Sequence, residues 1–172
     1  MYYQYPLEAL VHNPCAASQM EFARRARAVL QDTDELLSRS VPAGLALFAA
    51  NEAALEAPVR ILRDVYGDSV EVRAPRARLI PGNPPRHPIM SVRVSARAAD
   101  AAAILAELRR RGSGIAEECI RGRTLIVRAE APLCLLVGLP DFLARLSDGT
   151  ANAAIRLLRY EEMPDDLPPQ AA

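Results

Sequence analysis

A proline-rich run near the middle of the chain limits the possible folds more than any other feature. From Pro81 to Pro88 the sequence reads Pro-Gly-Asn-Pro-Pro-Arg-His-Pro. Proline lacks the backbone N–H that helices and central strands need, so this run predicts a break between two domains. We expect an N-terminal α/β region of unknown type over residues 1–82, a linker over 83–88, a C-terminal domain over 89–164 and a flexible tail over 165–172.

The size and composition predict a stable globular protein that holds no metal or cofactor. The 172 residues carry 21 basic and 21 acidic side chains, and a chain of this length buries roughly 70% of its unfolded surface. The three cysteines lie far apart in sequence, which predicts reduced, mostly buried thiols. There is no Cys-x-x-Cys pair and there are only two histidines, so a zinc site is not expected.

The distribution of apolar residues predicts a cytoplasmic protein. No apolar run reaches the roughly 18–20 residues that a membrane span needs. The segment Met1-Tyr-Tyr-Gln-Tyr lacks the basic and apolar regions of a signal peptide. We therefore expect no membrane partner.

The N-terminal region reads as an alternation of strands and helices. Asn51 is a candidate cap for a helix that carries Pro58, so that helix either begins near Glu56 or is kinked at the proline. The expected elements are a strand over 7–11, a helix over 16–39, a strand over 45–50, the helix after Asn51 up to Gly67, and a strand over 70–80 interrupted at Pro75.

The C-terminal region predicts an antiparallel sheet with two helices on one face. Met90, Val92 and Val94 alternate with polar residues, as in a half-buried strand. The further elements are a helix over 98–111, strands over 115–120 and 124–129 around a turn at Arg121-Gly122, a helix over 141–147 and a strand over 153–160. This β-α-β-β-α-β order is the ferredoxin-like unit, so we expect an α+β fold. The strand-helix-strand pattern of residues 45–80 echoes that of 90–129, without a repeat of individual residues.

Several positions of the C-terminal region match a known family at its spacing, apart from one extra residue, Gly114, before Ile115. They are Arg110-Arg111-Gly112, Ile115, Arg121-Gly122, Pro132-Leu133, Gly138, Leu143, Gly149, Ala151, Tyr160 and Pro164. This pattern resembles the C-terminal domain (domain V) of translational elongation factor G and related translational GTPases, over about residues 88–164. The chain departs from the family at Val137 and Leu139, where aromatics are usual, and at Thr150, where arginine is frequent.

The resemblance implies docking rather than catalysis. In the intact factors this domain carries no catalytic group and touches ribosomal RNA and protein. The chain has no Gly-x-x-x-x-Gly-Lys-Ser/Thr loop and contains no lysine, so we expect no GTP binding and no enzyme activity.

The densest basic run offers candidate contacts to RNA phosphates. Arg109, Arg110 and Arg111 end a predicted helix, and Arg121 and Arg123 flank the predicted hairpin turn. The simpler explanation of the run is the favourable placement of cations at a helix C-terminus. Phosphate contacts would instead give salt-sensitive, sequence-independent affinity.

Other residues with possible chemistry have simpler explanations. Tyr2, Tyr3 and Tyr5 could stack on bases, but packing of an N-terminal arm is the favoured interpretation. His87 lies in the predicted linker and is expected to be solvated, and His12 could cap a turn.

Two functions remain open. The first is a non-catalytic, stand-alone relative of the elongation factor G domain that binds ribosomal RNA, ribosomal protein or another translation-related partner. The second is a protein-interaction or self-association module without a ribosomal role, which would form a homo-oligomer or bind another protein. A small-ligand sensor between the two halves is a weaker third hypothesis.

Overall fold

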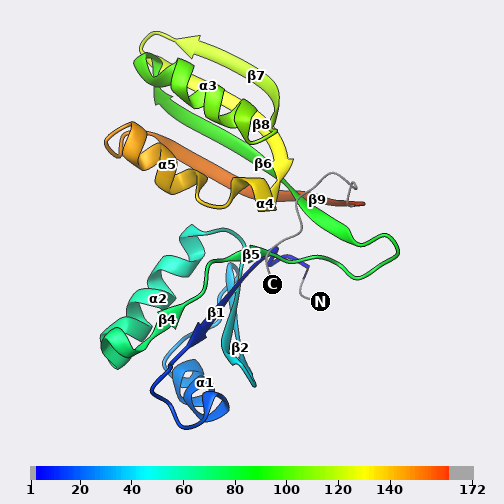
Figure 1. Cartoon of the computed structure of the whole chain (residues 1–172). Coiled ribbons are helices and arrows are strands. Elements are labelled where there is room, and N and C mark those ends of the chain that lie inside the picture. The colour runs from blue at the N-terminus through cyan, green and yellow to red at the C-terminus, as the bar shows by residue number, and fades with distance from the viewer. Residues whose placement is uncertain (1–2, 163–172) are drawn as a thin grey trace. The chain divides into compact units, whose positions relative to one another are not determined.

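The chain forms two compact units that meet in sequence at Arg78 and Leu79. The computed structural model describes residues 3–162 (Figure 1). The predicted tail over 165–172, the matched Pro164 and the side chain of Tyr2 lie outside the described residues.

The first unit is an antiparallel sheet with two main helices. Its strands are ordered β2-β3-β1-β4. Strand β5 also pairs with β1, at the opposite end of that strand from β4. The elements are β1 (Leu7–His12), α1 (Gln19–Ala28), β2 (Leu36–Val41), β3 (Gly44–Ala49), α2 (Ala53–Tyr66), a short 3-10 turn (Gly67–Ser69), β4 (Glu71–Val72) and β5 (Arg76–Ala77).

The helix predicted over residues 16–39 is wrong in its second half. Ser18 caps α1 by accepting a hydrogen bond from the Glu21 N–H at 3.3 Å, but the helix ends at Ala28. The Asp32 carboxylate then accepts from the N–H and the hydroxyl of Ser38, both at 2.8 Å. Such side-chain bonds compete with helical ones, and Leu36 and Leu37, which lie within the predicted helix, instead belong to strand β2 and pair with β3.

The predictions for α2 were partly right. The Asn51 side chain accepts from the Ala54 N–H at 3.0 Å, as a helix cap does, and the helix ends at Gly67 with φ of 65°. The alternative that the helix begins near Glu56 is wrong, because α2 begins at Ala53 and runs through Pro58. The following strand is interrupted around Pro75, as expected, into β4 and β5.

The second unit has the predicted α+β, ferredoxin-like fold. Its strands are ordered β7-β8-β6-β9, and every pairing is antiparallel. The elements are β6 (Arg86–Arg97), a 3-10 turn (Ala98–Asp100), α3 (Ala101–Arg110), β7 (Gly114–Arg121), β8 (Thr124–Pro132), α4 (Leu133–Leu136), α5 (Leu139–Leu146) and β9 (Asn152–Glu162). The short helix α4 was not predicted.

Part of the predicted linker belongs to a strand. Arg86 to Pro88 are the first residues of β6, and Pro88 lies opposite Tyr160 of β9. Strand β8 ends at Pro132, opposite Ile89, so Pro88 has a strand neighbour on one side only, whereas Arg86 also forms a bridge with Ile80. Proline is tolerated there because its missing N–H does not interrupt a second ladder.

The two units repeat one topology. β1, β2, β3 and β4 of the first unit occupy the places that β6, β7, β8 and β9 occupy in the second, with strand orders 2-3-1-4 and 7-8-6-9. In each unit one helix follows the first strand and another precedes the last strand. The predicted correspondence between residues 45–80 and 90–129 is therefore wrong, because β3-α2-β4 is equivalent to β8-α5-β9 and the repeat covers whole units.

In the second unit the helices cover one face of the sheet and leave the other open. Figure 1 shows α3 and α5 on the same side of strands β6 to β9. On the covered face, Val92, Val94 and Val127 are buried, and Leu143 of α5 is 1% exposed. Their sequence neighbours Arg93 and Arg128 are exposed and lie on the opposite, open face.

Candidate functional site

The predicted arginine run lies at the end of α3, where one carboxylate organises it. Glu107 is 7% exposed although it belongs to a surface helix. It accepts two hydrogen bonds of 2.7 Å from Arg110 and one of 2.7 Å from Arg111. The bonds from Arg110, followed by the one from Arg111, lower the pKa of Glu107 from 4.5 to about 2, against the opposing effect of burial. We call these three residues the Glu107 clasp.

Arg111 uses its guanidinium to hold the fold together. Besides binding Glu107, its Nη1 donates to the carbonyl oxygens of Leu135 and Val137, both at 2.9 Å. The side chain is 13% exposed. These bonds tie the end of α3 to the turn around α4, so Arg111 has little capacity left for an external phosphate.

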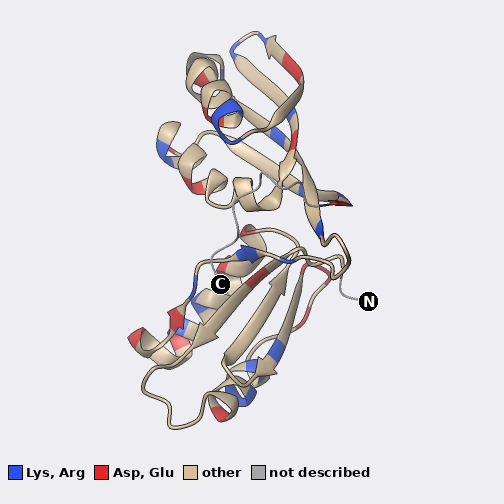
Figure 2. Ribbon diagram, turned by 45° about the vertical axis from the view of Figure 1, so that its right-hand side comes forward, with Lys and Arg blue, Asp and Glu red and all other residues tan. Residues whose placement is uncertain are grey.

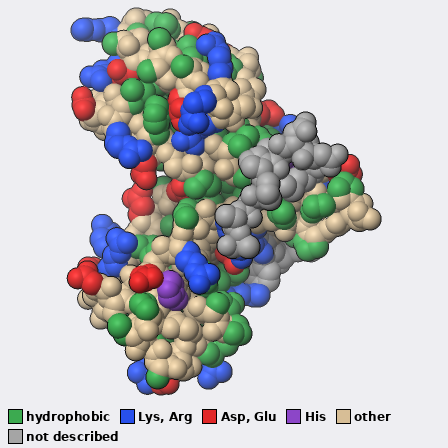
Figure 3. Space-filling model, viewed as in Figure 1, with side chains coloured by type: hydrophobic (Ala, Val, Ile, Leu, Met, Phe, Trp, Pro, Cys, Tyr) green, Lys and Arg blue, Asp and Glu red, His purple; other side chains and the backbone are tan. Residues whose placement is uncertain are grey.

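Arg109 and Arg110 remain exposed at this end of the helix, but their charges are partly balanced. Arg110 is bound to Glu107, and Arg109 lies 3.9 Å from the Glu118 carboxylate of β7. Figure 2 shows the acidic residues of β7 close to the basic end of α3. In the view of Figure 3, acidic and uncharged side chains separate the basic ones over the helical side of this unit.

The structure does not bring all five predicted arginines together. Arg121 and Arg123 flank the β7–β8 turn, where the Arg123 carbonyl accepts from the Ala98 N–H at 2.8 Å. Ala98 lies just before α3, whereas the Glu107 clasp lies at its other end. Within residues 3–162 neither Arg121 nor Arg123 has a side-chain hydrogen bond or ion pair.

The predicted solvation of His87 is wrong. Its side chain is 3% exposed, and burial lowers its pKa while the nearby Glu161 carboxylate raises it. His87 Nδ1 is buried without a hydrogen-bond partner.

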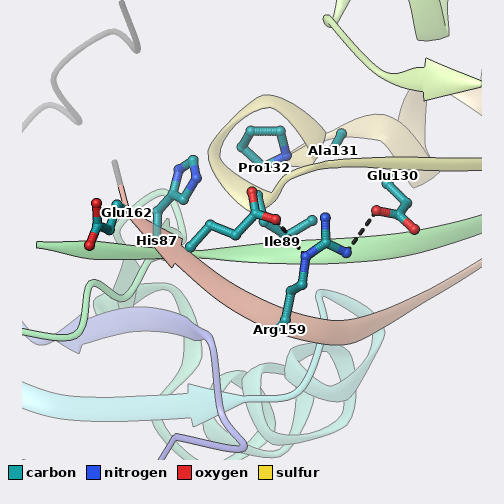
Figure 4. A pocket seen from close by; sticks show the side chains of 8 residues that line it. His87, Ile89, Glu130, Ala131, Pro132, Arg159 and Glu162 are labelled. Atoms are coloured by element: carbon teal, nitrogen blue, oxygen red, sulfur yellow. Dashed lines mark hydrogen bonds and ion pairs between the residues drawn. The ribbon is translucent and has the colours of Figure 1, made fainter. Parts of the chain in front are cut away.

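Figure 4 shows His87 beside an open hollow of about 370 Å³ whose lining is His87, Ile89, Glu130, Ala131, Pro132, Arg159, Glu161 and Glu162. Arg159 is bound to Glu130 at 2.8 Å and to Glu161 at 2.5 Å, so these three charged groups of the hollow satisfy one another.

The remaining candidate residues are the N-terminal tyrosines, His12 and the cysteines. Tyr5 is 7% exposed and donates to the Thr33 carbonyl at 3.1 Å, which is the packing role expected for the arm, whereas Tyr3 is 47% exposed. His12 Nε2 lies 3.1 Å from the Glu71 carboxylate. The following turn is capped by Asn13, whose side-chain oxygen accepts from the Cys15 N–H. Cys15 is exposed and the other two thiols are half-buried, so the expectation of mostly buried thiols is wrong for Cys15.

The described part of the chain holds neither a cluster of metal-ligating side chains nor a membrane-spanning helix. Within residues 3–162 no three His, Cys, Asp or Glu side chains converge as metal ligands would. None of the helices described is long and apolar enough to cross a bilayer.

Comparison with known proteins identifies the second unit. Residues 87–171 match the family model described as "Elongation factor G C-terminus". The second unit is a domain of the elongation factor G C-terminal type. Two of the family's matched glycines have left-handed backbones, Gly138 with φ of 77° and Gly149 with φ of 76°, which explains why glycine is needed there. The matched Leu143 belongs to the core and Tyr160 to the last strand.

The fold of the whole chain also resembles a solved structure. A crystal structure of the protein ttk003000868 from Thermus thermophilus superposes with a TM-score of 0.64 at 14% sequence identity. The match covers 92% of this chain and 41% of that one, so the present chain spans less than half of the larger protein. The likeness concerns the fold and includes both units. No curated protein matches the sequence.

Proposed function

We propose that this chain is a non-catalytic, translation-related binding protein of the cytoplasm whose second unit associates with the ribosome through RNA or protein. The observation that carries the proposal is the match of residues 87–171 to the elongation factor G C-terminus. No GTP or other cofactor takes part, because in this proposal the domain acts as a docking surface.

The environments of the arginines refine the proposed contacts. Arg109, Arg121 and Arg123 are exposed, whereas Arg110 shares Glu107 and Arg111 is bound internally. We therefore assign the outer contacts to Arg109 and Arg110 at one end of α3 and to Arg121 and Arg123 at the other, with Arg111 in a supporting role.

Co-sedimentation with ribosomes tests this proposal. We expect the protein to pellet with ribosomes at about 50 mM salt and to be released as the salt rises, because phosphate contacts displace counterions. The double substitution R109A/R110A should reduce the pelleted fraction, and the matched control R60A/R63A, which removes two exposed arginines of α2, should not. Protein that stays in the supernatant at every salt concentration contradicts the proposal.

A second candidate function is self-association or binding of another protein. It is favoured by α2, where Ile61 is 39% exposed and Val65, one turn later, is 54% exposed. Such a pair forms part of an apolar stripe that a partner can cover. Light scattering at micromolar concentration should then show a defined oligomer that I61S/V65S abolishes, and a monomer at all concentrations rules out the homo-oligomer.

A further inference from the structure

The open face of the second sheet carries a row of arginines that the sequence does not reveal. Val92 and Val94 of β6 point toward the helices, so Arg93 between them points away from them. Arg128 of β8 and Arg156 of β9 are exposed in the same alternation. We call these three residues the sheet-face arginines.

Strand register places the three side chains side by side. Arg93 lies directly opposite Arg128 in the β6–β8 ladder. In the β6–β9 ladder Arg156 lies opposite Ser91, two residues from Arg93, and therefore occupies a diagonal position. Directly opposite residues have Cβ atoms about 5 Å apart and diagonal ones about 7–8 Å, so one extended ligand could contact all three.

The neighbouring carboxylates leave this row largely unneutralised. Glu117 forms an ion pair with Arg128 at 3.3 Å, and Glu130 is bound by Arg159. Within residues 3–162 the guanidinium groups of Arg93 and Arg156 have no hydrogen bond or ion pair. Two uncompensated cations therefore stand beside a third that is only partly balanced.

A solvated sheet face explains exposed charges in general but not this arrangement. Like charges directly opposite each other destabilise a sheet, whereas opposite charges stabilise it. The other open-face positions around the row carry the two carboxylates and small or aliphatic residues, and no aromatic ring. They are Glu117, Glu130, Ser91, Ser95, Ile126, Ala154 and Cys119. The face thus offers charge without the stacking platforms that read single-stranded bases.

We propose that the sheet-face arginines bind the phosphate backbone of RNA. The inference rests on the proposed ribosomal function, because ribosomal RNA is the polyanion that such a protein would meet. It adds a contact on the face opposite α3 and α5 to the contacts proposed at the two ends of α3. Guanidinium groups form paired hydrogen bonds with phosphate oxygens, and these contacts are independent of base sequence.

A labelled RNA duplex of mixed sequence provides the test. The three sheet-face contacts should contribute a factor of about 40 to the weakening of the affinity between about 50 and 200 mM salt, and the loss of two of them should reduce that factor to about 3. Fluorescence anisotropy should show this change for R93A/R156A. The matched control R60A/R63A, with two exposed arginines of α2 removed, should behave as the wild type. Circular dichroism should show that both variants remain folded.

Three outcomes overturn the inference. The first is an R93A/R156A protein that binds the duplex as the wild type does, while R109A/R110A does not bind. The second is equal competition by poly-glutamate at matched charge, which would indicate an acidic protein partner. The third is loss of duplex binding in R60A/R63A as well, which would indicate a dependence on net charge alone. Ribosome pelleting by the same variants separates the two proposals, since pelleting that survives R93A/R156A sinks the sheet-face contact and leaves the proposed function standing.

Discussion

The two units share a topology but differ in the charged residues that neighbouring strands place opposite one another. In the first unit Arg76 of β5 lies opposite Glu8 of β1, and their charged groups are 3.5 Å apart. In the second unit Arg93 lies opposite Arg128. The buried alternate residues fix the topology in both units, whereas the exposed alternate residues are free to specialise. The contrast teaches that a shared fold sets where side chains point and not which ligand they meet.

The largest expected effect comes from leucine substitutions in the hydrophobic cores of the two units. Leu62 of α2 is fully buried and Leu143 of α5 is 1% exposed, and each belongs to the second main helix of its unit. We expect L62A and L143A each to lower the free energy of unfolding by about 3 kcal/mol, because both leave a cavity. Hydrogen exchange should show the greater loss of protection in the unit that carries the substitution. V65A, at a position 54% exposed, is the control with little effect, and a variant that loosens only the other unit would break the comparison.

The next test compares two Glu–Arg pairs with the same helical spacing. Glu21 and Arg25 on α1 are both exposed, whereas Glu107 and Arg111 on α3 are largely buried. We expect E107Q to lower the free energy of unfolding by about 2 kcal/mol and E21Q by about 0.3 kcal/mol, since burial determines what an ion pair contributes. Chemical denaturation of the two variants measures both values.

The pH dependence of stability gives a second test of the buried Glu107–Arg111 pair. The pKa of Glu107 in the folded protein is about 2, below its ordinary 4.5. The stability that it contributes is therefore fully present above about pH 4.5 and is lost as the pH falls toward 2. The E107Q variant should lack this part of the acid-induced loss. Parallel acid titration curves for the wild type and E107Q would argue against the clasp.

The smallest expected effects concern the charged residues on the exposed sheet faces. R76A removes an opposite-charge pair and should lower the free energy of unfolding by about 0.5 kcal/mol. R93A removes a like-charge pair and should raise it by about 0.3 kcal/mol. Urea midpoints at low salt measure both. At about 1 M salt the two differences should shrink, because the screening length is then about 3 Å. A loss of stability in R93A as large as that in R76A would show that Arg93 has a stabilising partner.

The sequence predicted those parts of the fold whose signals are local. Alternating valines identified β6, and the turn at Arg121-Gly122 identified the β7–β8 hairpin. The predicted helix over 16–39 failed because Asp32 and Ser38 form a local bond that composition does not reveal. The strand start at Arg86 was missed because proline was read without knowing which neighbours the strand has.

The arginines proposed to contact RNA also show that only local signals could be predicted from the sequence. Arg109 to Arg111 attracted attention because they are adjacent in sequence, yet adjacent helical residues point in different directions, and Arg111 is turned inward. Arg93, Arg128 and Arg156 are far apart in sequence and meet only through the register of three strands. Register depends on tertiary packing, so this row could not be predicted from the chain alone.

The unequal environments within the arginine run have a consequence for how the protein can change over generations. Arg111 joins α3 to the carbonyl oxygens of Leu135 and Val137, so its replacement loosens two elements at once. Arg109 has only a carboxylate 3.9 Å away. Mutations can therefore alter the outer charge of this helix end, and with it the choice of partner, while a single inward arginine keeps the scaffold intact.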